Sequence, residues 1–491
     1  MQFISTRGRA KVDCASRAIS QGLADDGGLY VPEKFPSVNV GEMLSMDYAE
    51  RACFVLIQYL TEYDEKELLS ACKSAYGKFD DENTVPVVKI NDNLFIMELF
   101  HGPTLAFKDV ALTLLPYLLR AGSDYIGVKE EILILVATSG DTGKAALEGF
   151  KDQKGIKIMV FYPSEGVSDM QKAQMTTQEG SNVNVVAVKG NFDDCQNAVK
   201  KIFSSDDIAN RLKEKGVVLS SANSINFGRL APQITYYFSS YCDLVNSGEI
   251  KLGDKVSFVV PTGNFGNILA GYYAKQMGLP IEKLVCASNS NNVLTEFILS
   301  GTYDKNREFF KTMSPSMDIL ISSNLERLIF ELSGRDAKLT ATRMEELKNC
   351  GKYSISKQEM INLNKEFSAD YCEEEECLET LAEFFDEYGY VLDTHTAVAV
   401  NVADKFVQND YSACEPIIVL STASPYKFTQ SVVKAISGKF EKDAFKASKK
   451  LENLTACPMP NQIIELETKE KRFNKVIDKN QTVDAVMEFV E

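Results

Sequence analysis

The chain has 491 residues, and at roughly 150 residues per domain this length predicts about two or three domains. Its 45% hydrophobic and 25% charged residues are typical of a globular protein and argue against disorder, collagen and coiled coil. The 69 acidic residues outnumber the 53 basic ones, and the resulting net charge of −16 repels nucleic-acid phosphates and anionic lipids. We therefore expect no nucleic acid and no membrane as partner, whereas a small anionic substrate remains compatible with the charge.

The cysteines and histidines exclude several kinds of site. The 11 cysteines are scattered without a CxxC pair, which indicates reduced thiols and a cytoplasmic location. With only 2 histidines in the chain, we expect no metal site. The polar N-terminus lacks the apolar core of a secretory signal, and no apolar run reaches the ~18 residues of a membrane span.

Residues 1–85 are predicted to be mainly helical. Apolar spacing predicts helices over residues 47–60 and 64–79. Residues 94–99 read as a buried strand, and residues 109–121 as a helix that Pro116 should kink.

From Glu131 the pattern becomes strand, turn and helix in alternation, which predicts an α/β fold with a parallel sheet covered on both faces. The charged stretch 302–390 breaks this rhythm, and we expect a helical insertion on the surface there. The predicted strands lie at residues 132–137, 157–162, 183–188, 217–221, 256–260, 284–287 and 417–420.

The segment PTGNFGN, residues 261–267, follows an apolar strand and precedes a helix. Gly263 and Gly266 permit tight backbone angles, and the exposed amides with the helix N-terminus form a cradle for an anion. Because the GK[ST] of a nucleotide loop and the full GxGxxG are missing, a single phosphate fits best. The alternative is a plain glycine turn between strand and helix.

The segment TSGDTG, residues 138–143, has the same setting. Its hydroxyl groups, including those of Ser139 and Thr142, come to the carboxyl edge of the sheet, where open α/β sheets bind ligands. The alternative is that Ser139 or Asp141 merely caps the helix.

Lys108 stands between Phe107 and Asp109 at the predicted start of an apolar helix. Apolar surroundings and a helix N-terminus both disfavour an ammonium group and lower its pKa, which suits Schiff-base chemistry. The alternative is a lysine that reaches solvent from the helix start.

Together, a reactive lysine, a monophosphate cradle and a hydroxyl-rich turn point to pyridoxal 5′-phosphate. The turn STAS after the last strand offers Ser421, Thr422 or Ser424 to the pyridine nitrogen. A neutral hydroxyl there would leave that nitrogen largely unprotonated.

These residues resemble the longer bacterial and fungal form of the threonine synthase family, within the tryptophan-synthase-β-like (fold type II) pyridoxal phosphate enzymes. The resemblance covers almost the whole chain, in the family's order, through FISTRG, QGLADDGGLYVP, ELFHGPTLAFKD, VATSGDTGKAA, GNFDDCQ, NSIN, PTGNFGN, SSNLER and DTHTAV. Three departures are Leu325, where the family usually has Phe, Ser424, where it often has His, and Thr394, where it often has Pro. The family's own start at residue 3 argues against a mitochondrial presequence.

The resemblance implies a carbon–oxygen lyase that converts O-phospho-L-homoserine and water into L-threonine and phosphate, with Lys108 as the catalytic lysine that binds the cofactor. It further implies cofactor contacts from Gly263, Asn264, Phe265, Gly266, Asn267 and Thr422. Candidate substrate-binding residues are Ser139, Thr142, Asn226 and Arg229, of which Arg229 suits a phosphate.

Composition and resemblance together predict three domains. Residues 1–90 would form a mainly helical domain, 91–128 with 222–491 a large cofactor-binding domain, and 129–221 a smaller inserted α/β domain. We expect a monomer or a homodimer. The alternatives are another eliminating or replacing pyridoxal phosphate enzyme, such as a dehydratase or cysteine synthase, and a non-catalytic threonine-synthase-like binding protein.

Overall fold

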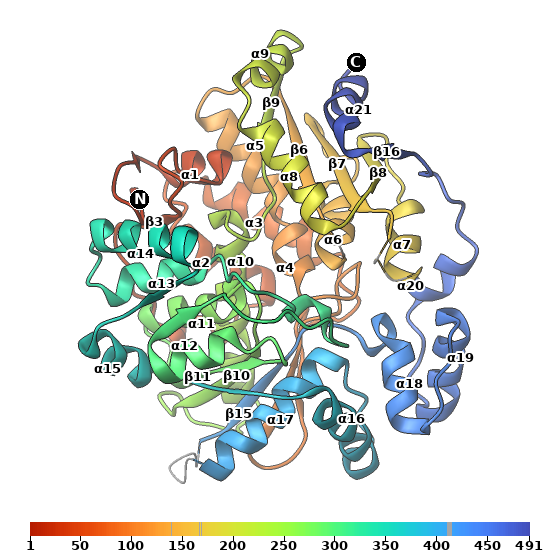
Figure 1. Cartoon of the computed structure of the whole chain (residues 1–491). Coiled ribbons are helices and arrows are strands. Elements are labelled where there is room, and N and C mark those ends of the chain that lie inside the picture. The colour runs from red at the N-terminus through yellow and green to blue at the C-terminus, as the bar shows by residue number, and fades with distance from the viewer. Residues whose placement is uncertain (139, 166, 168, 410–414) are drawn as a thin grey trace.

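The computed structural model describes residues 1–138, 140–165, 167, 169–409 and 415–491. Two parallel sheets dominate it, and Figure 1 shows the five-stranded sheet above the six-stranded one. The α/β class predicted from the sequence is confirmed. None of the helices in the described part combines the length and the hydropathy that a membrane span requires.

The six-stranded sheet has the order β14-β11-β10-β15-β5-β4 and is parallel except for β4, which pairs antiparallel with β5. The central strands β10 and β15 are buried along their whole length, as expected of a sheet covered on both faces. The strands are β4 (Val87–Lys89), β5 (Leu94–Glu98), β10 (Val256–Pro261), β11 (Ile281–Ser288), β14 (Phe367–Tyr371) and β15 (Ile417–Ser421).

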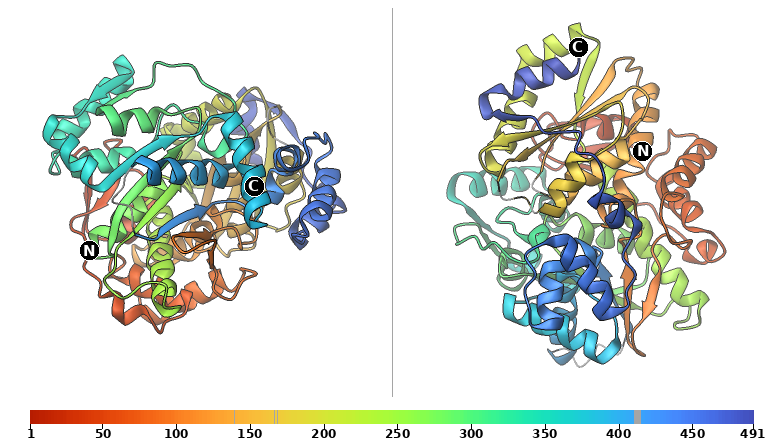
Figure 2. Two further views of the ribbon diagram at one scale, coloured as in Figure 1. Left: turned by 90° about the horizontal axis from the view of Figure 1, so that it is seen from below. Right: turned by 90° about the vertical axis from the view of Figure 1, so that its right-hand side faces the viewer.

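The five-stranded sheet has the order β16-β8-β7-β6-β9 and is parallel throughout. Its outer strand β16 comes from the C-terminal end, which the sequence placed with the other sheet. In the right-hand view of Figure 2, the dark blue chain runs from the lower lobe up to α21 at the top. The strands are β6 (Glu131–Ala137), β7 (Ile156–Pro163), β8 (Val183–Lys189), β9 (Val217–Ser220) and β16 (Val476–Asp478).

Helices cover both sheets. α10, α11, α12, α15 and α17 pack on the strands of the six-stranded sheet, and α6, α8 and α9 pack on those of the five-stranded sheet. These helices are α6 (Asp141–Phe150), α8 (Phe192–Phe203), α9 (Asp206–Glu214), α10 (Phe227–Asn246), α11 (Gly266–Gln276), α12 (Val293–Ser300), α15 (Lys357–Glu366) and α17 (Thr394–Asn409). The others after the N-terminal segment are α4 (Lys108–Leu112), α5 (Leu115–Tyr125), α7 (Asp169–Thr176), α13 (Leu325–Leu332), α14 (Ala337–Cys350), α16 (Glu374–Tyr388), α18 (Thr429–Ser437), α19 (Ala444–Thr455), α20 (Asn461–Ile464) and α21 (Thr482–Phe489).

The N-terminal segment combines helices with a small antiparallel sheet of order β2-β1-β3. Its elements are β1 (Phe3–Ser5), β2 (Lys11–Val12), α1 (Ala15–Gln21), β3 (Tyr30–Pro32), α2 (Tyr48–Ile57) and α3 (Glu65–Tyr76). The predicted domain boundaries stay a prediction.

Two sequence expectations are modified by the structure. Pro116 does not kink one helix but stands in the first turn of α5, where its missing N–H needs no partner, so the predicted helix is two helices, α4 and α5. The stretch 302–390 contains the expected helices α13 to α16, but also the hairpin β12 (Thr302–Asp304)–β13 (Lys352–Ser354) and the edge strand β14.

The parallel strands bring the predicted turns to one place. β6, β10 and β15 end directly before residues 138, 262 and 422, and α4 begins at Lys108 shortly after β5. α4 lies between the two sheets in Figure 1. A site at this position has both sheets as its walls.

Candidate active site between the two sheets

Lys108 is the first residue of α4, and 13% of its side chain is exposed. Its Nζ donates a hydrogen bond to Oγ of Ser316 at 3.3 Å and lies 3.7 Å from Oδ2 of Asp141. Leu105, three residues earlier, has a φ of 61°, which is rare for a bulky residue. The backbone before the lysine is thus held in a strained turn, a feature that concentrates at functional sites.

Burial and the nearby charges together lower the pKa of Lys108. Burial lowers the pKa of Lys108, Asp141 opposes this, and the positive charges of Lys427 and Arg229 lower the pKa further. The lowered pKa predicted from the sequence is confirmed. Burial alone would raise the pKa of Asp141, but Lys427 and Lys108 outweigh burial and hold this pKa well below its usual range.

The predicted phosphate loop has the backbone of a tight cradle. Phe265, directly before α11, adopts a φ of 62°. A Cβ on Gly263 would come 2.6 Å from the carbonyl oxygen of Ser316, so only glycine fits there. The carbonyl oxygen of Gly263 accepts a hydrogen bond from Oγ of Ser322, and that of Asn264 accepts one from Nδ2 of Asn324. Carbonyl groups are therefore held away from the cradle by their own partners.

Two tyrosines of α10 hold the end of the loop 261–267. Oδ1 of Asn267 accepts hydrogen bonds from the hydroxyls of Tyr236 and Tyr237, at 2.5 and 3.0 Å. Within the described part of the chain, Nδ2 of Asn267 has no hydrogen-bond partner although it is buried. Gly266 begins α11, and its nearest neighbour for an added Cβ is Nδ2 of Asn324 at 3.4 Å. A donor of Asn267 thus remains for an anion.

Thr422 follows β15 and is buried. Its carbonyl oxygen accepts a hydrogen bond from the backbone N–H of Phe107 at 2.9 Å, one residue before the lysine. Ser424 donates its own backbone N–H to the carbonyl oxygen of Leu105. The STAS turn and the segment that carries Lys108 are therefore directly bonded to each other.

In the turn 138–143, Thr138 caps the helix and Asp141 faces the lysine. Oγ1 of Thr138 accepts hydrogen bonds from the backbone N–H groups of Gly140 and Gly143, so Asp141 is not needed as a cap and instead faces Lys108. Thr142 lies half-buried beside Asp141. Ser139 lies outside the described residues.

The two predicted substrate residues at the start of α10 differ in whether they have a free hydrogen-bond donor. The Nδ2 group of Asn226 donates to the carbonyl oxygens of Ile19 and Ser221, and its Oδ1 caps α10. Arg229 donates one N–H to the carbonyl oxygen of Ala222, whereas its buried Nε has no partner among the described residues. Burial lowers the pKa of Arg229 to about 10. Of this pair, only Arg229 retains an unused donor.

Sequence reasoning missed Ser316, which lies in the stretch read as a surface insertion. It stands in a 3-10 helix, η2 (Pro315–Met317), and receives the hydrogen bond of Lys108. Nε2 of His395 accepts the backbone N–H of Ser316 at 3.1 Å. Lys427, which stands between the aromatic residues Tyr426 and Phe428, was also overlooked.

These groups fit pyridoxal phosphate. The buried Nζ of Lys108 can bind an aldehyde, the glycine loop 263–267 can take a phosphate, and the Thr422 hydroxyl can meet a pyridine nitrogen. The strained φ of Phe265 and the unused Nδ2 of Asn267 are what a loop shaped for an anion requires.

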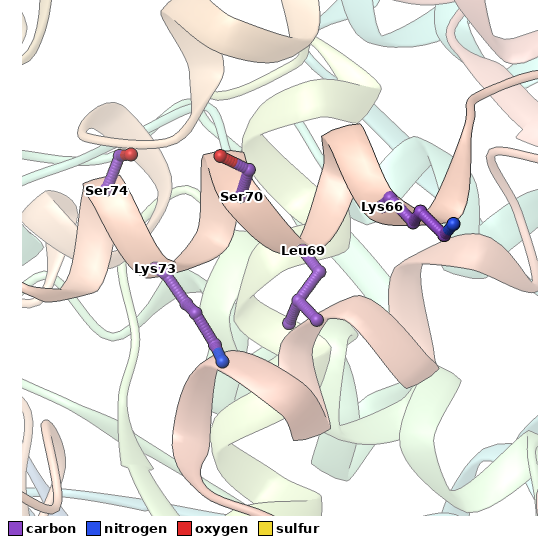
Figure 3. Close-up of a pocket in the computed structure, with 5 residues that line it drawn as sticks. All are labelled: Lys66, Leu69, Ser70, Lys73 and Ser74. Atoms are coloured by element: carbon purple, nitrogen blue, oxygen red, sulfur yellow. The ribbon is translucent and has the colours of Figure 1, made fainter.

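A surface hollow of about 470 Å³ lies on α3 (Figure 3) and is a different kind of feature. It is open and contains two lysines and two serines of one helix. Its lining residues are Lys66, Leu69, Ser70, Lys73 and Ser74, none of them a predicted site residue.

Three known families together match almost the whole chain. Residues 84–422 match the family described as pyridoxal-phosphate dependent enzyme, residues 2–76 match the threonine synthase N terminus, and residues 396–490 match the threonine synthase C-terminal family. The chain belongs to the threonine synthase family of pyridoxal-phosphate dependent enzymes. The predicted family is therefore confirmed.

Individual relatives within this family differ in length. The chain is 44% identical over 456 residues to human threonine synthase-like 1, covering 88% of itself but only 60% of that protein. It is 40% identical to threonine synthase of Pseudomonas aeruginosa, covering 89% of itself and 90% of that enzyme. The solved structure of pyridoxal-phosphate-bound threonine synthase from Brucella melitensis is 38% identical, with a TM-score of 0.89 over 100% of this chain and 98% of that one.

Proposed function

We propose that this chain is a threonine synthase, which converts O-phospho-L-homoserine and water into L-threonine and inorganic phosphate, the last step of threonine biosynthesis. The observation that carries the proposal is the position of Lys108, whose Nζ lies beside Asp141 and Ser316 where the turns after β6, β10 and β15 meet. Membership of the threonine synthase family supports the choice of substrate.

Pyridoxal phosphate, when bound, supplies the electron sink for chemistry on the carbons beside the substrate's amino group. Lys108 would hold its aldehyde, residues 263–267 its phosphate, and Thr422 its ring nitrogen. The hydroxyl of Thr422 is neutral, so it would not hold a proton on that nitrogen as a carboxyl group would.

Lys108 has the properties of a proton carrier at the substrate. Because burial and the nearby cations lower its pKa, the side chain is present as the free amine to a greater extent than an ordinary lysine. That amine can accept the proton from the substrate Cα and return it later in the reaction. Ser316, which accepts the Lys108 hydrogen bond, orients the nitrogen.

Arg229 would bind the phosphate group of the substrate. The reaction requires a second anion site, because the loop 263–267 serves the cofactor. Arg229 has an unused Nε and a guanidinium fork suited to phosphate oxygens. Thr142 would bind the substrate from the turn after β6, and a substrate contact of Ser139 stays a prediction of the sequence. The Asn226 amide already has three backbone partners, so its role toward substrate remains only the sequence prediction.

A second candidate is a threonine-synthase-like protein that binds the same ligands without making threonine. The 44% identity to human threonine synthase-like 1 favours it. The presence of Lys108, both glycine turns and Thr422 favours an enzyme instead. That the chain acts in the cytoplasm as a monomer or homodimer stays a prediction of the sequence.

The test is to incubate the full-length protein with O-phospho-L-homoserine, with and without added pyridoxal phosphate, and to quantify phosphate and threonine together. A threonine synthase releases the two in equal amounts. Phosphate with 2-oxobutyrate would identify an eliminating enzyme, and a yellow protein that releases no phosphate would support the second candidate.

A further inference from the structure

Asp141 lies between two lysines that come from different parts of the fold. Nζ of Lys427 lies 3.0 Å from its Oδ1, and Nζ of Lys108 lies 3.7 Å from its Oδ2. Lys427 stands in the 3-10 helix η3 (Pro425–Lys427), after β15, and Asp141 begins α6. The side chains of Lys427 and Asp141 are 1% and 2% exposed, so this ion pair is almost completely removed from water.

The surroundings of Lys427 match an ammonium group. Besides Asp141, its Nζ donates to the carbonyl oxygen of Thr104 at 2.8 Å and to Oε1 of Gln174 at 3.3 Å. An ammonium group has three donors, and three acceptors surround this one. A charged lysine is therefore built into the site without any role in the mechanism above.

Titratable groups from several elements lie around Lys108 and Asp141. Asp141 on α6 favours its ammonium form, whereas Lys427 on η3 and Arg229 on α10 oppose that form. His395 on α17 faces Asp141. Asp109 on α4 accepts a hydrogen bond from the backbone N–H of Thr104, and the charge of Lys427 favours its ionised form. Without Lys427, the carboxylate of Asp141 would have Lys108 as its nearest cation. It would then favour the protonated form of Lys108.

We propose that Lys427 is a positioning residue that pairs with Asp141 and thereby leaves the Nζ of Lys108 free to react as an amine. The inference rests on the proposed function only in taking Lys108 as the lysine that reacts. Removal of the positive charge at residue 427 should therefore make Lys108 less reactive, and removal of both charges should restore it.

The experiment measures the reactivity of Lys108 directly, in the full-length chain without cofactor or substrate. The protein is labelled with trace acetic anhydride between pH 6 and 10, and acetylation at Lys108 is quantified by mass spectrometry. In Lys427→Met, the midpoint of the profile should rise by about one pH unit, which lowers labelling about tenfold near neutral pH. Lys427→Arg, which keeps the charge, should follow the wild type.

Two further variants make the test independent of folding defects. Lys427→Met/Asp141→Asn removes the whole pair, and its profile should return toward that of the wild type. Asp141→Asn alone keeps Lys427 and should lower the midpoint, so the proposal is tested even if Lys427→Met does not accumulate. Lys144, which pairs with Glu148, is the internal control and should label equally in every variant.

A Lys427→Met profile equal to that of the wild type would overturn the proposal, and so would an unchanged midpoint in Asp141→Asn. A double variant as unreactive as Lys427→Met would show a packing defect instead of a charge effect and would also overturn it. Labelling needs no turnover, so the result of this experiment does not depend on the result of the threonine assay.

Discussion

The Nε2 atom of His395 accepts a hydrogen bond from the backbone N–H of Ser316 at 3.1 Å. Since a backbone N–H can only donate, Nε2 carries no proton, and the proton of the neutral ring sits on Nδ1, which donates to Oδ1 of Asp393 at 2.9 Å. His395 and Asp393 are both buried. This pair fixes Ser316, whose Oγ holds Lys108 and whose carbonyl oxygen packs against Gly263.

Replacing His395 should loosen the segment that joins the lysine to the cofactor loop. In His395→Leu, the Ser316 N–H loses its partner and the Asp393 carboxylate loses one of its donors, at a cost of about 1–3 kcal/mol in the free energy of unfolding. Pyridoxal phosphate affinity, measured by absorbance titration, should fall as well. His395→Gln retains an acceptor and should recover part of the loss, and His101→Gln is the matched control. Wild-type affinity in His395→Leu would contradict this role.

Gly263→Ala should weaken cofactor binding specifically. The new Cβ would stand 2.6 Å from the Ser316 carbonyl oxygen, and the overpacking costs about 1–3 kcal/mol, or about 5- to 150-fold in affinity. Gly266→Ala is the comparison, because its Cβ would meet Nδ2 of Asn324 at 3.4 Å and should cost less. Titration of both variants with pyridoxal phosphate tests this order, and equal losses would show that the Ser316 contact does not shape the loop.

Arg229→Met should raise KM for the phosphorylated substrate about tenfold or more and change kcat less, because a charge-assisted hydrogen bond of about 1.5–3 kcal/mol is lost. Steady-state kinetics on O-phospho-L-homoserine give both constants. Arg17→Met is the control, since Arg17 is about half exposed and pairs only with Asp13 among the described ion pairs. If KM stayed at the wild-type value, the second anion site would lie elsewhere.

His101 should make the stability of the protein depend on pH. Burial lowers the pKa of His101, but hydrogen bonds to Glu98 and Asp80 outweigh it and raise this pKa above its usual value. The protonated ring therefore contributes stability that is complete below about pH 6.5 and is lost as the pH rises through the higher folded-state pKa. Chemical denaturation should show His101→Gln to be less stable than the wild type at pH 6, by less than about 1 kcal/mol, and closer to it at pH 9. A deficit that grows with pH would contradict this.

The sequence was sufficient where local pattern decides the structure. Buried apolar runs alternating with helices predicted the strands β6, β7, β8 and β10, and the turns after β6, β10 and β15 predicted where they would meet. Lys108 was found because a lysine between apolar residues at a helix start needs an explanation.

Residues recruited by tertiary structure carried no local signal. Ser316 lies in a charged stretch whose composition predicts surface, and only folding brings it to Lys108. Asp141 looked like a helix cap because capping by Thr138 cannot be distinguished from sequence. Strand β16 joins β8 across almost 300 residues of chain, and its three residues form no pattern by themselves.

Identifying the lysine that binds the cofactor covalently tests the role of Lys108 directly. Full-length protein loaded with pyridoxal phosphate is reduced with sodium borohydride, digested and mapped by mass spectrometry. Among the described residues of this region, Lys108, Lys144 and Lys427 have buried amino groups, so the map discriminates among them. We expect a stoichiometric adduct on Lys108 that disappears in Lys108→Ala. An adduct on Lys427 or Lys144, or an unchanged yield in Lys108→Ala, would show that Lys108 is not the lysine that binds the cofactor.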